Sequence, residues 1–339
     1  MANSHSIVIR IALAAVLVGL SGCLPEDELV APIERGDVRA ATVRMGSDYA
    51  QRVYFDFGSN SSVKSVDFAL WDLEFSCRPG HFDVRLNSAK FASVADLGAI
   101  NFSEVDAAMI KQAEFRYDVQ SGDVDSSAVG AWWQTDEEPG AVSRKHVYAL
   151  DRGYSAAGEK NGRALFRIES ADENAYVVSV AQIDGSNAAT YSVKRDDRFN
   201  YIGFDFDGKT VFEHEPPRES WDLVFTKYVF VFYQPEPLPY SVNGALLNPE
   251  LASATEYFEG QFELIDRETA AAAVLSKRPD AIGYDWKTFI LQESLYIVDS
   301  SRSFIVRDAA GFLYKLRFTD FYDPESGDKG SPGFEFQRL

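Results

Sequence analysis

The sequence predicts a mainly β protein of two tandem antiparallel β domains, each with one short helix. Segments rich in aromatic and β-branched residues, turn dipeptides between them and an internal repeat lead to this fold class. Residues 71–75 (WDLEF) return as 221–225 (WDLVF), and 55–57 (FDF) return as 204–206. An offset of about 150 residues is the size of a domain and too long for a solenoid repeat.

Two further landmarks keep the same order. Residues 130–133 (GAWW) resemble 283–286 (GYDW), and 148–151 (YALD) resemble 296–299 (YIVD). We therefore expect one domain at residues 47–195 and a second at 196–339. Because no long linker separates them, the two domains should pack directly on each other.

The strands are expected where apolar side chains alternate or run on. Trp71, Leu73 and Phe75 should share one buried face, as should Trp221 with its Leu and Phe. Cys77 has the same parity and should be a buried apolar residue. Other strands are predicted at 53–57, at 224–233, which is apolar enough to be buried on both faces, at 314–318 and at 334–336.

Turns and helices fill the intervals. Turns are predicted at 184–185, 207–208, 327–328 and 330–333. Residues 323–328 (DPESGD) have alternating oxygen ligands but lack the EF-hand length and closing glutamate, so a hairpin loop is expected. Short helices are predicted at 104–112, with Ser103 as the cap, and at 268–276.

The N-terminus is typical of an exported lipoprotein. Residues 1–22 read as a signal peptide, and 20–23 (LSGC) are similar to a bacterial lipobox whose Cys23 carries the lipid. Residues 23–46 should be a tether. Its start, 24–28 (LPEDE), resembles the acidic export tag of surface lipoproteins in Bacteroidetes-type bacteria, or is a plain solvated tether. We expect an outer-membrane lipoprotein at the cell surface, held by its lipid alone.

Composition excludes several functions. A net charge of −19 disfavours nucleic acid, and two cysteines give neither a disulfide framework nor a thiolate metal site. Phosphate-binding loops, a zinc helix and a nucleophile elbow are absent from the sequence. His81, His146 and His214 are too scattered to predict a metal site, and acidic pairs such as 136–138 and 196–197 read as solvated. We therefore expect a binding protein and not an enzyme.

A family resemblance adds to this picture. Residues 311–322 (GFLYKLRFTDFY), then Gly327, Gly330 and 334–336 (FEF), resemble the closing strands of the HmuY family of haem-binding lipoproteins. The Trp-Asp strand of that family is matched at Trp71 and Trp221, and its later tryptophan segment at Trp133 and Trp286. The resemblance covers nearly all of residues 50–339 as two copies and implies a mainly β fold that binds haem.

The chain departs from the family at the haem ligands. Members of the family hold haem between two histidine or methionine side chains, whereas residues 221–339 contain no His, Met or Cys. The candidates that remain are His146, as the leading axial ligand of one site in the first domain, then Met109, His81 and His214. A tyrosine is a further option. With His146 as ligand, affinity should fall below pH about 6.5, because ligation needs a neutral imidazole.

Two functions are therefore expected. In the first, the protein captures haem, free or from a haem protein, or a related apolar ligand and passes it to an outer-membrane transporter. In the second, the protein is a haem-independent surface binding or adhesion module that keeps the fold.

Overall fold

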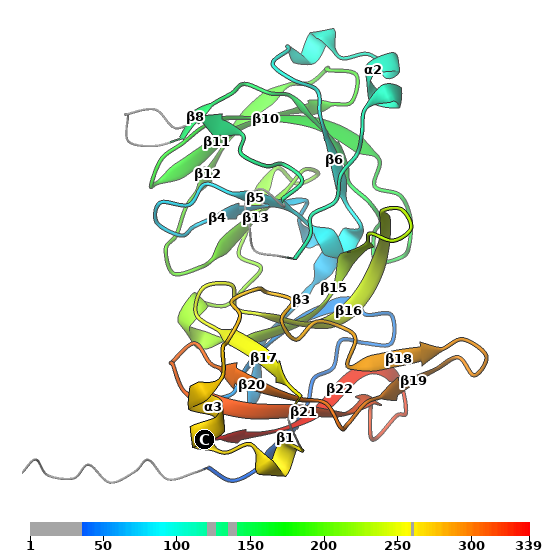
Figure 1. Cartoon of the computed structure of the whole chain (residues 1–339). Coiled ribbons are helices and arrows are strands. Elements are labelled where there is room, and N and C mark those ends of the chain that lie inside the picture. Colours follow the sequence, from blue (N-terminus) through cyan, green and yellow to red (C-terminus); the bar gives the residue numbers. More distant parts are fainter. Residues whose placement is uncertain (1–35, 121–126, 135–140, 259–260) are drawn as a thin grey trace, which may run out of the picture. The chain divides into compact units, whose positions relative to one another are not determined.

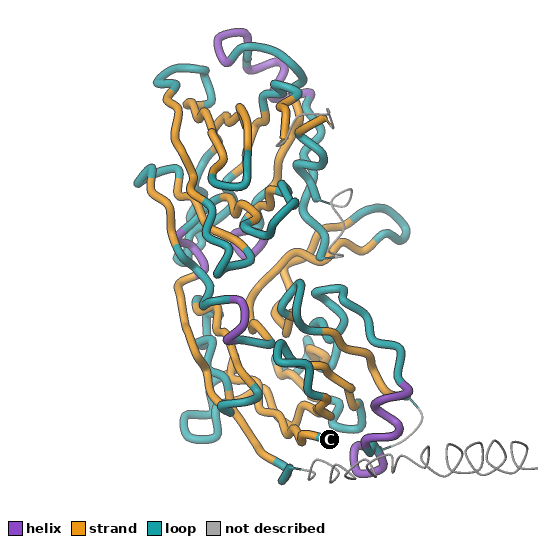
Figure 2. The backbone as a smooth tube through the Cα atoms, turned by 90° about the vertical axis from the view of Figure 1, so that its left-hand side faces the viewer, coloured by secondary structure: helices purple, strands orange, loops and turns teal. Residues whose placement is uncertain are grey.

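The computed structural model describes residues 36–120, 127–134, 141–258 and 261–339. The predicted signal peptide, Cys23 and the acidic pair at 136–138 lie outside the described residues. Strands dominate the trace and the helices are short, so the predicted mainly β, antiparallel fold class is confirmed (Figures 1 and 2). None of the helices in these ranges is long and apolar enough to cross a membrane.

The strands form four larger sheets and one hairpin. The five-stranded sheet has the order β1 (Arg39–Thr42), β22 (Lys329–Arg338), β21 (Leu313–Tyr322), β20 (Ser303–Arg307) and β17 (Ser253–Tyr257). The seven-stranded sheet contains β12 (Ala189–Lys194), β11 (Ala175–Gln182), β10 (Arg163–Ala171), β8 (Ala141–Ser143), β7 (Trp133–Gln134), β9 (Tyr148–Asp151) and β6 (Ser93–Asp96).

Each of the two four-stranded sheets combines strands from both repeated segments of the chain. One has the order β14 (Thr210–Phe212), β13 (Tyr201–Asp205), β4 (Leu73–Ser76) and β5 (Val84–Leu86). The other has the order β16 (Leu238–Leu247), β15 (Leu223–Phe232), β2 (Gln51–Asp56) and β3 (Ser61–Asp67). A separate hairpin is made of β18 (Lys287–Ile290) and β19 (Leu295–Val298).

Both predicted helices exist with different bounds, since the first starts later than expected and the second starts one residue earlier and ends earlier. They are α2 (Ala107–Gln112) and α3 (Arg267–Ala272), capped by Asp106 and Asp266. Ser103 is not a helix cap, because it lies inside a preceding 3-10 turn whose capping box joins Asn101 and Glu104. That turn is η3 (Phe102–Glu104), and the other 3-10 turns in the described ranges are η1 (Phe68–Leu70), η2 (Ser88–Lys90), η5 (Arg218–Ser220) and η6 (Phe262–Leu264).

The structure corrects two local expectations and confirms a third. The tether is shorter than predicted, because β1 pairs with β22 and Val43 and Met45 are fully buried. The turn expected at residues 330–333 is part of strand β22. The hairpin loop at 323–328 is confirmed, with the Asp323 carboxylate accepting from the N–H groups of Glu325 and Ser326.

The two repeated segments exchange strands. Strand β2 of the first copy pairs with β15 of the second, with Phe55 opposite Leu223. Strand β13 of the second copy pairs with β4 of the first, with Phe204 opposite Leu73. One hydrophobic cluster therefore combines Leu73 to Val193 with Phe199 to Phe206, and another combines Val43 to Phe57 with Leu223 to Phe336. The domain bounds at 47–195 and 196–339 stay a prediction. Each of the two hydrophobic clusters contains residues from both sides of the expected boundary.

The hydrogen bonds at the two crossing points match. Asp72 N–H donates to Phe204 O, and Asp222 N–H donates to Phe55 O. The Asn87 side chain donates to the carbonyls of Phe68 and Trp71. The Asn248 side chain donates to the carbonyls of Arg218 and Trp221 in the same way. The repeat read from the sequence is thus also a repeat of local structure.

Trp71 and Trp221 are buried, as predicted, but not beside their strand neighbours. Both lie in a third cluster with Tyr54, Val224 and Tyr228. Leu73 and Phe75 point into the first cluster instead. Trp71 lies just before β4, at the end of η1, where its orientation is free of the strand's alternation. Cys77 is buried in the first cluster as expected, and burial raises the pKa of its thiol to about 11.

Candidate functional site

A hollow lined mainly by aromatic residues lies between two hairpins of the second repeat. We call it the aromatic groove. It has a volume of about 500 Å³. Its lining contains five aromatic residues, together with Leu238, Val242 and three polar residues. The aromatic members are Phe232, Tyr240, Tyr284, Phe289 and Tyr296. A pocket of this size and apolar lining is typical of small-molecule sites.

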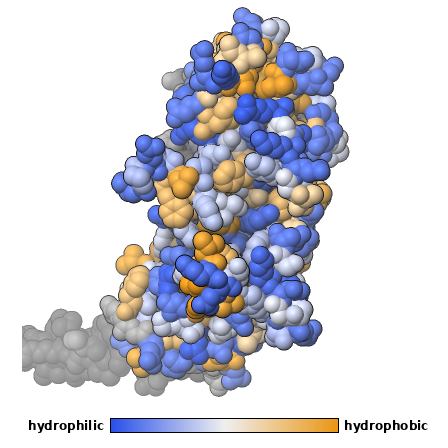
Figure 3. All heavy atoms as spheres, turned by 90° about the vertical axis from the view of Figure 1, so that its right-hand side faces the viewer, coloured by the Kyte–Doolittle hydropathy of each residue, from blue (hydrophilic) through white to orange (hydrophobic). Residues whose placement is uncertain are grey.

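The groove exists because two hairpins extend past their sheets. Strand β2 pairs with β15 only at Leu223–Phe225, whereas β15 and β16 pair with each other as far as Phe232 and Leu238. The outer end of that hairpin faces β18 and β19, which pair only with each other. Figure 3 shows the side on which β18 and β19 project in Figure 1, and apolar residues gather there in its lower half. Both hairpins leave apolar side chains exposed.

Aromatic contacts organise the walls of the groove. The rings of Phe230 and Tyr284 lie 5.0 Å apart, and those of Phe232 and Tyr240 lie 6.4 Å apart. On the facing hairpin, Phe289 lies 4.8 Å from Tyr296. Such edge and tilted pairs are worth about 0.5–1.5 kcal/mol beyond their buried area. The walls are therefore partly preorganised, with ring faces left for a flat ligand.

Lys287 supplies the groove's buried charge. Its Nζ donates to the carbonyls of Asn243 at 2.6 Å and Tyr284 at 3.2 Å. It also lies 4.1 Å from the centre of the Trp286 ring. Burial lowers the pKa of this amine to about 7, although the nearby Asp285 acts in the opposite direction. A ligand carboxylate beside this amine would favour the charged form.

A second hollow, of about 40 Å³, lies among the crossing strands and is polar. It is lined by Arg52, Glu74, Arg85 and Glu215 among others. This volume holds a few water molecules and is too small for a large apolar ligand. Burial raises the pKa of Glu215 to about 8, even though the N–H groups of Asn200 and Tyr201 donate to its carboxylate.

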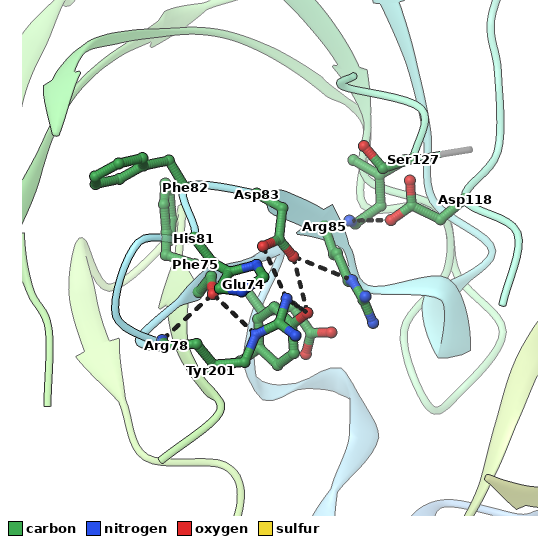
Figure 4. A network of polar contacts seen from close by, with 12 residues as sticks. Glu74, Phe75, Arg78, His81, Phe82, Asp83, Arg85, Asp118, Ser127 and Tyr201 are labelled. Atoms are coloured by element: carbon green, nitrogen blue, oxygen red, sulfur yellow. Dashed lines mark hydrogen bonds and ion pairs between the residues drawn. The ribbon is translucent and has the colours of Figure 1, made fainter. Parts of the chain in front are cut away.

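An ion network supports one wall of this polar cavity (Figure 4). Arg78 Nη2 lies 3.0 Å from Asp83 Oδ1, and the Tyr201 hydroxyl donates to Asp83 Oδ2 at 2.8 Å. Arg85 Nε lies 3.5 Å from Asp83 Oδ2. Burial opposes the charged form of Asp83, but Arg85 and Arg78 outweigh it and lower the pKa of its carboxyl. The network ties β4, β5 and β13 together.

The acids on both sides of His214 are typical of a solvated loop, but the structure buries this histidine. Its side chain is fully buried and stacks on Trp71, with ring centres 4.5 Å apart. Nδ1 lies 3.2 Å from the Tyr54 hydroxyl, and Nε2 lies 3.2 Å from Glu74 Oε2 without hydrogen-bond geometry. A Cβ at Gly203 would lie 3.1 Å from the imidazole, so this glycine leaves room for the stack. Burial lowers the pKa of His214 well below its usual value.

The other predicted ligands lie apart from the groove. His146 precedes β9, and its Nδ1 lies 2.8 Å from Asp96 Oδ2, with the side chain 29% exposed. His81 is exposed in the turn closed by its N–H and Arg78 O. Met109 is half-buried in α2, where Ile110 is the buried residue. None of the four is among the groove's described lining residues, and no cluster of three or more His, Cys, Asp or Glu residues fit for a metal occurs in the described ranges.

The sequence pattern did not predict the groove residues. One signal was the apolar run 224–233, which is longer than its pairing with β2. The other was the set of apolar residues among polar ones at 286–298. Tyr233 and Leu291 in these segments are exposed. The expected histidine and methionine ligands, apart from His214, lie in the first repeat.

Comparison with known proteins identifies one family. The family model described as HmuY protein matches residues 48–336. No curated protein matches the chain.

Solved structures are similar over most of the chain, at low identity. The apo HmuY analogue of Tannerella forsythia is 8% identical and covers 91% of this chain and 98% of its own, with a TM-score of 0.26. Apo PinO from Porphyromonas gingivitis is 12% identical, covering 89% and 97%, also with a TM-score of 0.26. A Bacteroides vulgatus protein, provisionally described as HmuY-like and heme-binding, is 10% identical, covering 89% and 94%, with a TM-score of 0.23. These scores are too low to compare sites.

Proposed function

Because the chain belongs to the HmuY family, we propose that it is a surface-anchored lipoprotein that binds haem or a related flat apolar ligand for uptake. The observation that supports this most is the aromatic groove of about 500 Å³ with a single buried amine. The name of the Bacteroides vulgatus structure, which includes heme binding, adds to it. In this proposal the protein is a binding protein and not an enzyme, and an outer-membrane transporter receives the ligand.

The groove's residues fit a porphyrin in size and chemistry. The ring faces of Phe232, Tyr240 and Phe289 would hold its apolar surface, and burying that surface favours binding. The amine of Lys287 would pair with a propionate. Histidine, methionine and cysteine are absent from residues 221–339, so a phenolate of Tyr240 or Tyr284 would be the iron ligand in this groove. Burial raises the pKa of Tyr284 and so opposes its phenolate form, which iron would have to stabilise.

This location differs from the first-repeat site expected around His146. His146 stays a proposed ligand for a second, weaker site, because its ring is partly exposed and its Nδ1 is held by Asp96. His214 would have to leave its stack on Trp71 before it could bind a metal. Met109 and His81 have no described contact that orients their side chains toward a ligand. The groove is therefore the site that we favour.

Haemin titration distinguishes the two sites. We expect Tyr240→Ala to weaken haemin binding about tenfold, because a stacking surface and a hydroxyl are lost. His146→Ala should leave the affinity nearly unchanged, and Tyr154→Ala, at an exposed tyrosine outside the groove, is the matched control. The measurement is the Soret band of the full mature chain at neutral pH. Loss of the band in His146→Ala with a normal Tyr240→Ala protein would place the site in the first repeat.

The pH dependence of the same titration has opposite signs for the two sites. In the free protein the Lys287 amine has a pKa of about 7, and a bound carboxylate favours its protonated form. The contribution of Lys287 to affinity should therefore be highest below pH 7 and fall as pH rises through it, whereas release of the phenol proton on ligation acts in the opposite direction. The difference in affinity between wild type and Lys287→Met isolates this contribution and should shrink as pH rises through 7. A histidine ligand predicts a fall below pH about 6.5 instead. Lys287→Arg keeps its positive charge, so this variant should bind haemin both below and above pH 7.

The alternative proposal is a haem-independent surface binding or adhesion module. The observation that favours it is that His81, Met109, His146 and His214 all lie outside the groove's described lining. The same ring faces would then receive another flat or apolar ligand. A haemin titration indistinguishable from free haemin with inert protein would decide for this function.

Anchoring is tested at Cys23. We expect Cys23→Ala to prevent lipid attachment and to release the exported protein into the soluble fraction, because lipid is the proposed anchor. Cell fractionation with an antibody measures this, and Cys77→Ala is the control for loss of a thiol. A processed Cys23→Ala protein that stays with the membrane at the wild-type level would contradict the lipid anchor.

We also propose that the chain is one domain duplicated in tandem. The sequence landmarks at an offset of about 150 residues support this, as do the matching bonds of Asn87 and Asn248 to the carbonyls of Trp71 and Trp221. Ligand binding would then belong to one copy. The second repeat has the extended hairpins that form the groove, and the first supplies strand β2 to the sheet from which one of them grows.

A further inference from the structure

We propose that the protein rests on the lipid surface through the outer layer of its five-stranded sheet. This inference depends on the lipid anchor proposed above. We call the surface the anchor-side face and define it by Val38, Phe258, Leu264, Val274 and Phe312. All five are large apolar residues that the structure leaves exposed.

Val274 and Phe258 are the two most exposed large apolar residues in the described ranges, at 90% and 83%. Leu264 is 66% exposed. The exposed apolar residues of the first repeat, such as Val63 and Leu70, reach less than half. A hollow of about 530 Å³ lies between the end of β17 and the end of α3, lined by Phe258, Val274 and Ile305 among others. Exposed apolar side chains beside such a hollow mark an interaction surface.

The face belongs to one structural layer. The helix α3 and turn η6 cover the outer side of the sheet through a cluster of Ile265, Ala270, Ile305 and Leu339. Phe258 follows β17, Leu264 ends η6 and Val274 follows α3. Their apolar side chains therefore surround the small helix that caps this side, where the exposed Arg267 and Lys277 are balanced by the exposed Glu263 and Glu268.

The chain enters the fold at the same layer. The Gly36 N–H donates to Arg338 O at 3.1 Å. The Arg338 guanidinium lies 3.6 Å from the centre of the Phe312 ring. Leu339, the next residue, packs with Ala270 of α3. The segment that leads from the lipid site thus joins the fold beside the exposed apolar residues.

The length of the preceding chain favours a lipid surface as the occupant. About 12 residues separate Cys23 from Gly36, and a fully extended chain of that length reaches only about 40 Å. The point of entry is therefore always close to the bilayer when Cys23 is lipidated. The whole chain carries a net charge of −19 and charge does not draw it to an anionic surface, so the lipid tether and apolar contact are what would hold this face there.

The test uses tryptophan reporters on the full mature chain. Residues 23–339 are linked through Cys23 to a maleimide lipid, since Cys77 is buried and unreactive by comparison. The protein is added to phosphatidylethanolamine and phosphatidylglycerol vesicles with brominated acyl chains. We expect Val274→Trp to lose fluorescence on these vesicles. Val63→Trp, at an exposed valine of the first repeat, should be unchanged and is the matched control.

The outcomes separate this inference from the anchor proposal. Equal quenching of the two reporters, or quenching of neither, on vesicles that carry the lipid-linked protein overturns the anchor-side face. Because the lipid is attached chemically, this result does not depend on processing in the cell. A failure of native anchoring would appear separately, as membrane-bound Cys23→Ala protein, and would overturn the inference with its premise. Haemin binding is measured on the same samples and is expected to be unchanged by Val274→Trp.

Discussion

Asp72→Asn is expected to lower the free energy of unfolding by about 3–5 kcal/mol, because it removes the negative partner of buried cations. The Asp72 carboxylate is fully buried and accepts from Lys90 Nζ at 2.5 Å and from Arg152 Nη2 at 2.9 Å. It also accepts from the Phe206 N–H at 2.9 Å. Lys90 is 3% exposed, so solvent cannot replace the lost charge.

Asp222→Asn is the matched control within the same chain. Asp222 holds the equivalent place in the repeat, but its carboxylate accepts from the N–H groups of Phe57 and Ala309, each at 2.7 Å. Neither partner is a cation, so the change should cost about 1–3 kcal/mol, the penalty of one unsatisfied buried N–H. Urea unfolding of the two variants at pH 7 makes the comparison. Equal losses, or a larger loss at Asp222, would contradict this account.

The two variants should also differ in pH dependence. Burial raises the pKa of Asp222 to about 7 in the folded protein, above its unfolded value. The stabilisation from this group is therefore complete below the unfolded pKa of about 4 and is lost as pH rises toward and through 7. Asp222→Asn should remove that loss. Its stability relative to wild type should improve from pH 4 to pH 7.

Trp71→Ala and Trp221→Ala are each expected to cost about 3–5 kcal/mol, the range for large core truncations. Trp71 stacks on His214, and Trp221 meets Tyr54 edge to face at 4.9 Å. Because both tryptophans lie in one cluster, their effects on the free energy of unfolding should not be additive. The loss in the double variant should differ from the sum of the two single losses. Trp133→Ala, at a half-buried tryptophan, should cost less. Thermal and urea unfolding measure these differences.

The contrary result is well defined. Losses below about 1 kcal/mol at both Trp71 and Trp221 would be typical of surface substitutions. The third cluster would then not join the two repeats, and the indole rings would be available for binding.

Sequence patterns predicted the strands well and their partners poorly. The alternation at Leu73 and Phe75 gives a strand, and the repeat shows that Phe55 and Phe204 are equivalent. Because the two are equivalent, the sequence cannot show which strand pairs with which. The strand with Phe55 and the strand with Phe204 are each compatible with either strand that follows a Trp-Asp pair. Which one pairs depends on the chain's path in space. The same limit explains Trp71, whose side chain leaves the face predicted by parity because it precedes the strand.

The candidate site was predicted less well for a chemical reason. His214 stands between Glu213 and Glu215, a pattern typical of a solvated loop, yet Glu215 is buried through bonds from the N–H groups of Asn200 and Tyr201. The groove's aromatic residues resemble core residues in sequence, since Tyr284 and Phe289 differ in no local way from buried rings. The groove wall differs from a core because the β15–β16 hairpin continues beyond its pairing with β2, and β18 and β19 pair only with each other.

The exchange of strands between the repeats has a consequence for the proposed export. If the chain is exported unfolded, as the lipoprotein proposal requires, it emerges from its N-terminus. Strand β2 then waits for a partner that follows much later, since Phe57 and Asp222 are 165 positions apart, and Gly36 waits for Gln337, 301 positions on. Contacts so distant in sequence form slowly. The first repeat therefore emerges with its β2 edge and apolar face unpaired, and a periplasmic holdase that shields them until the last strand arrives would raise the yield of folded protein.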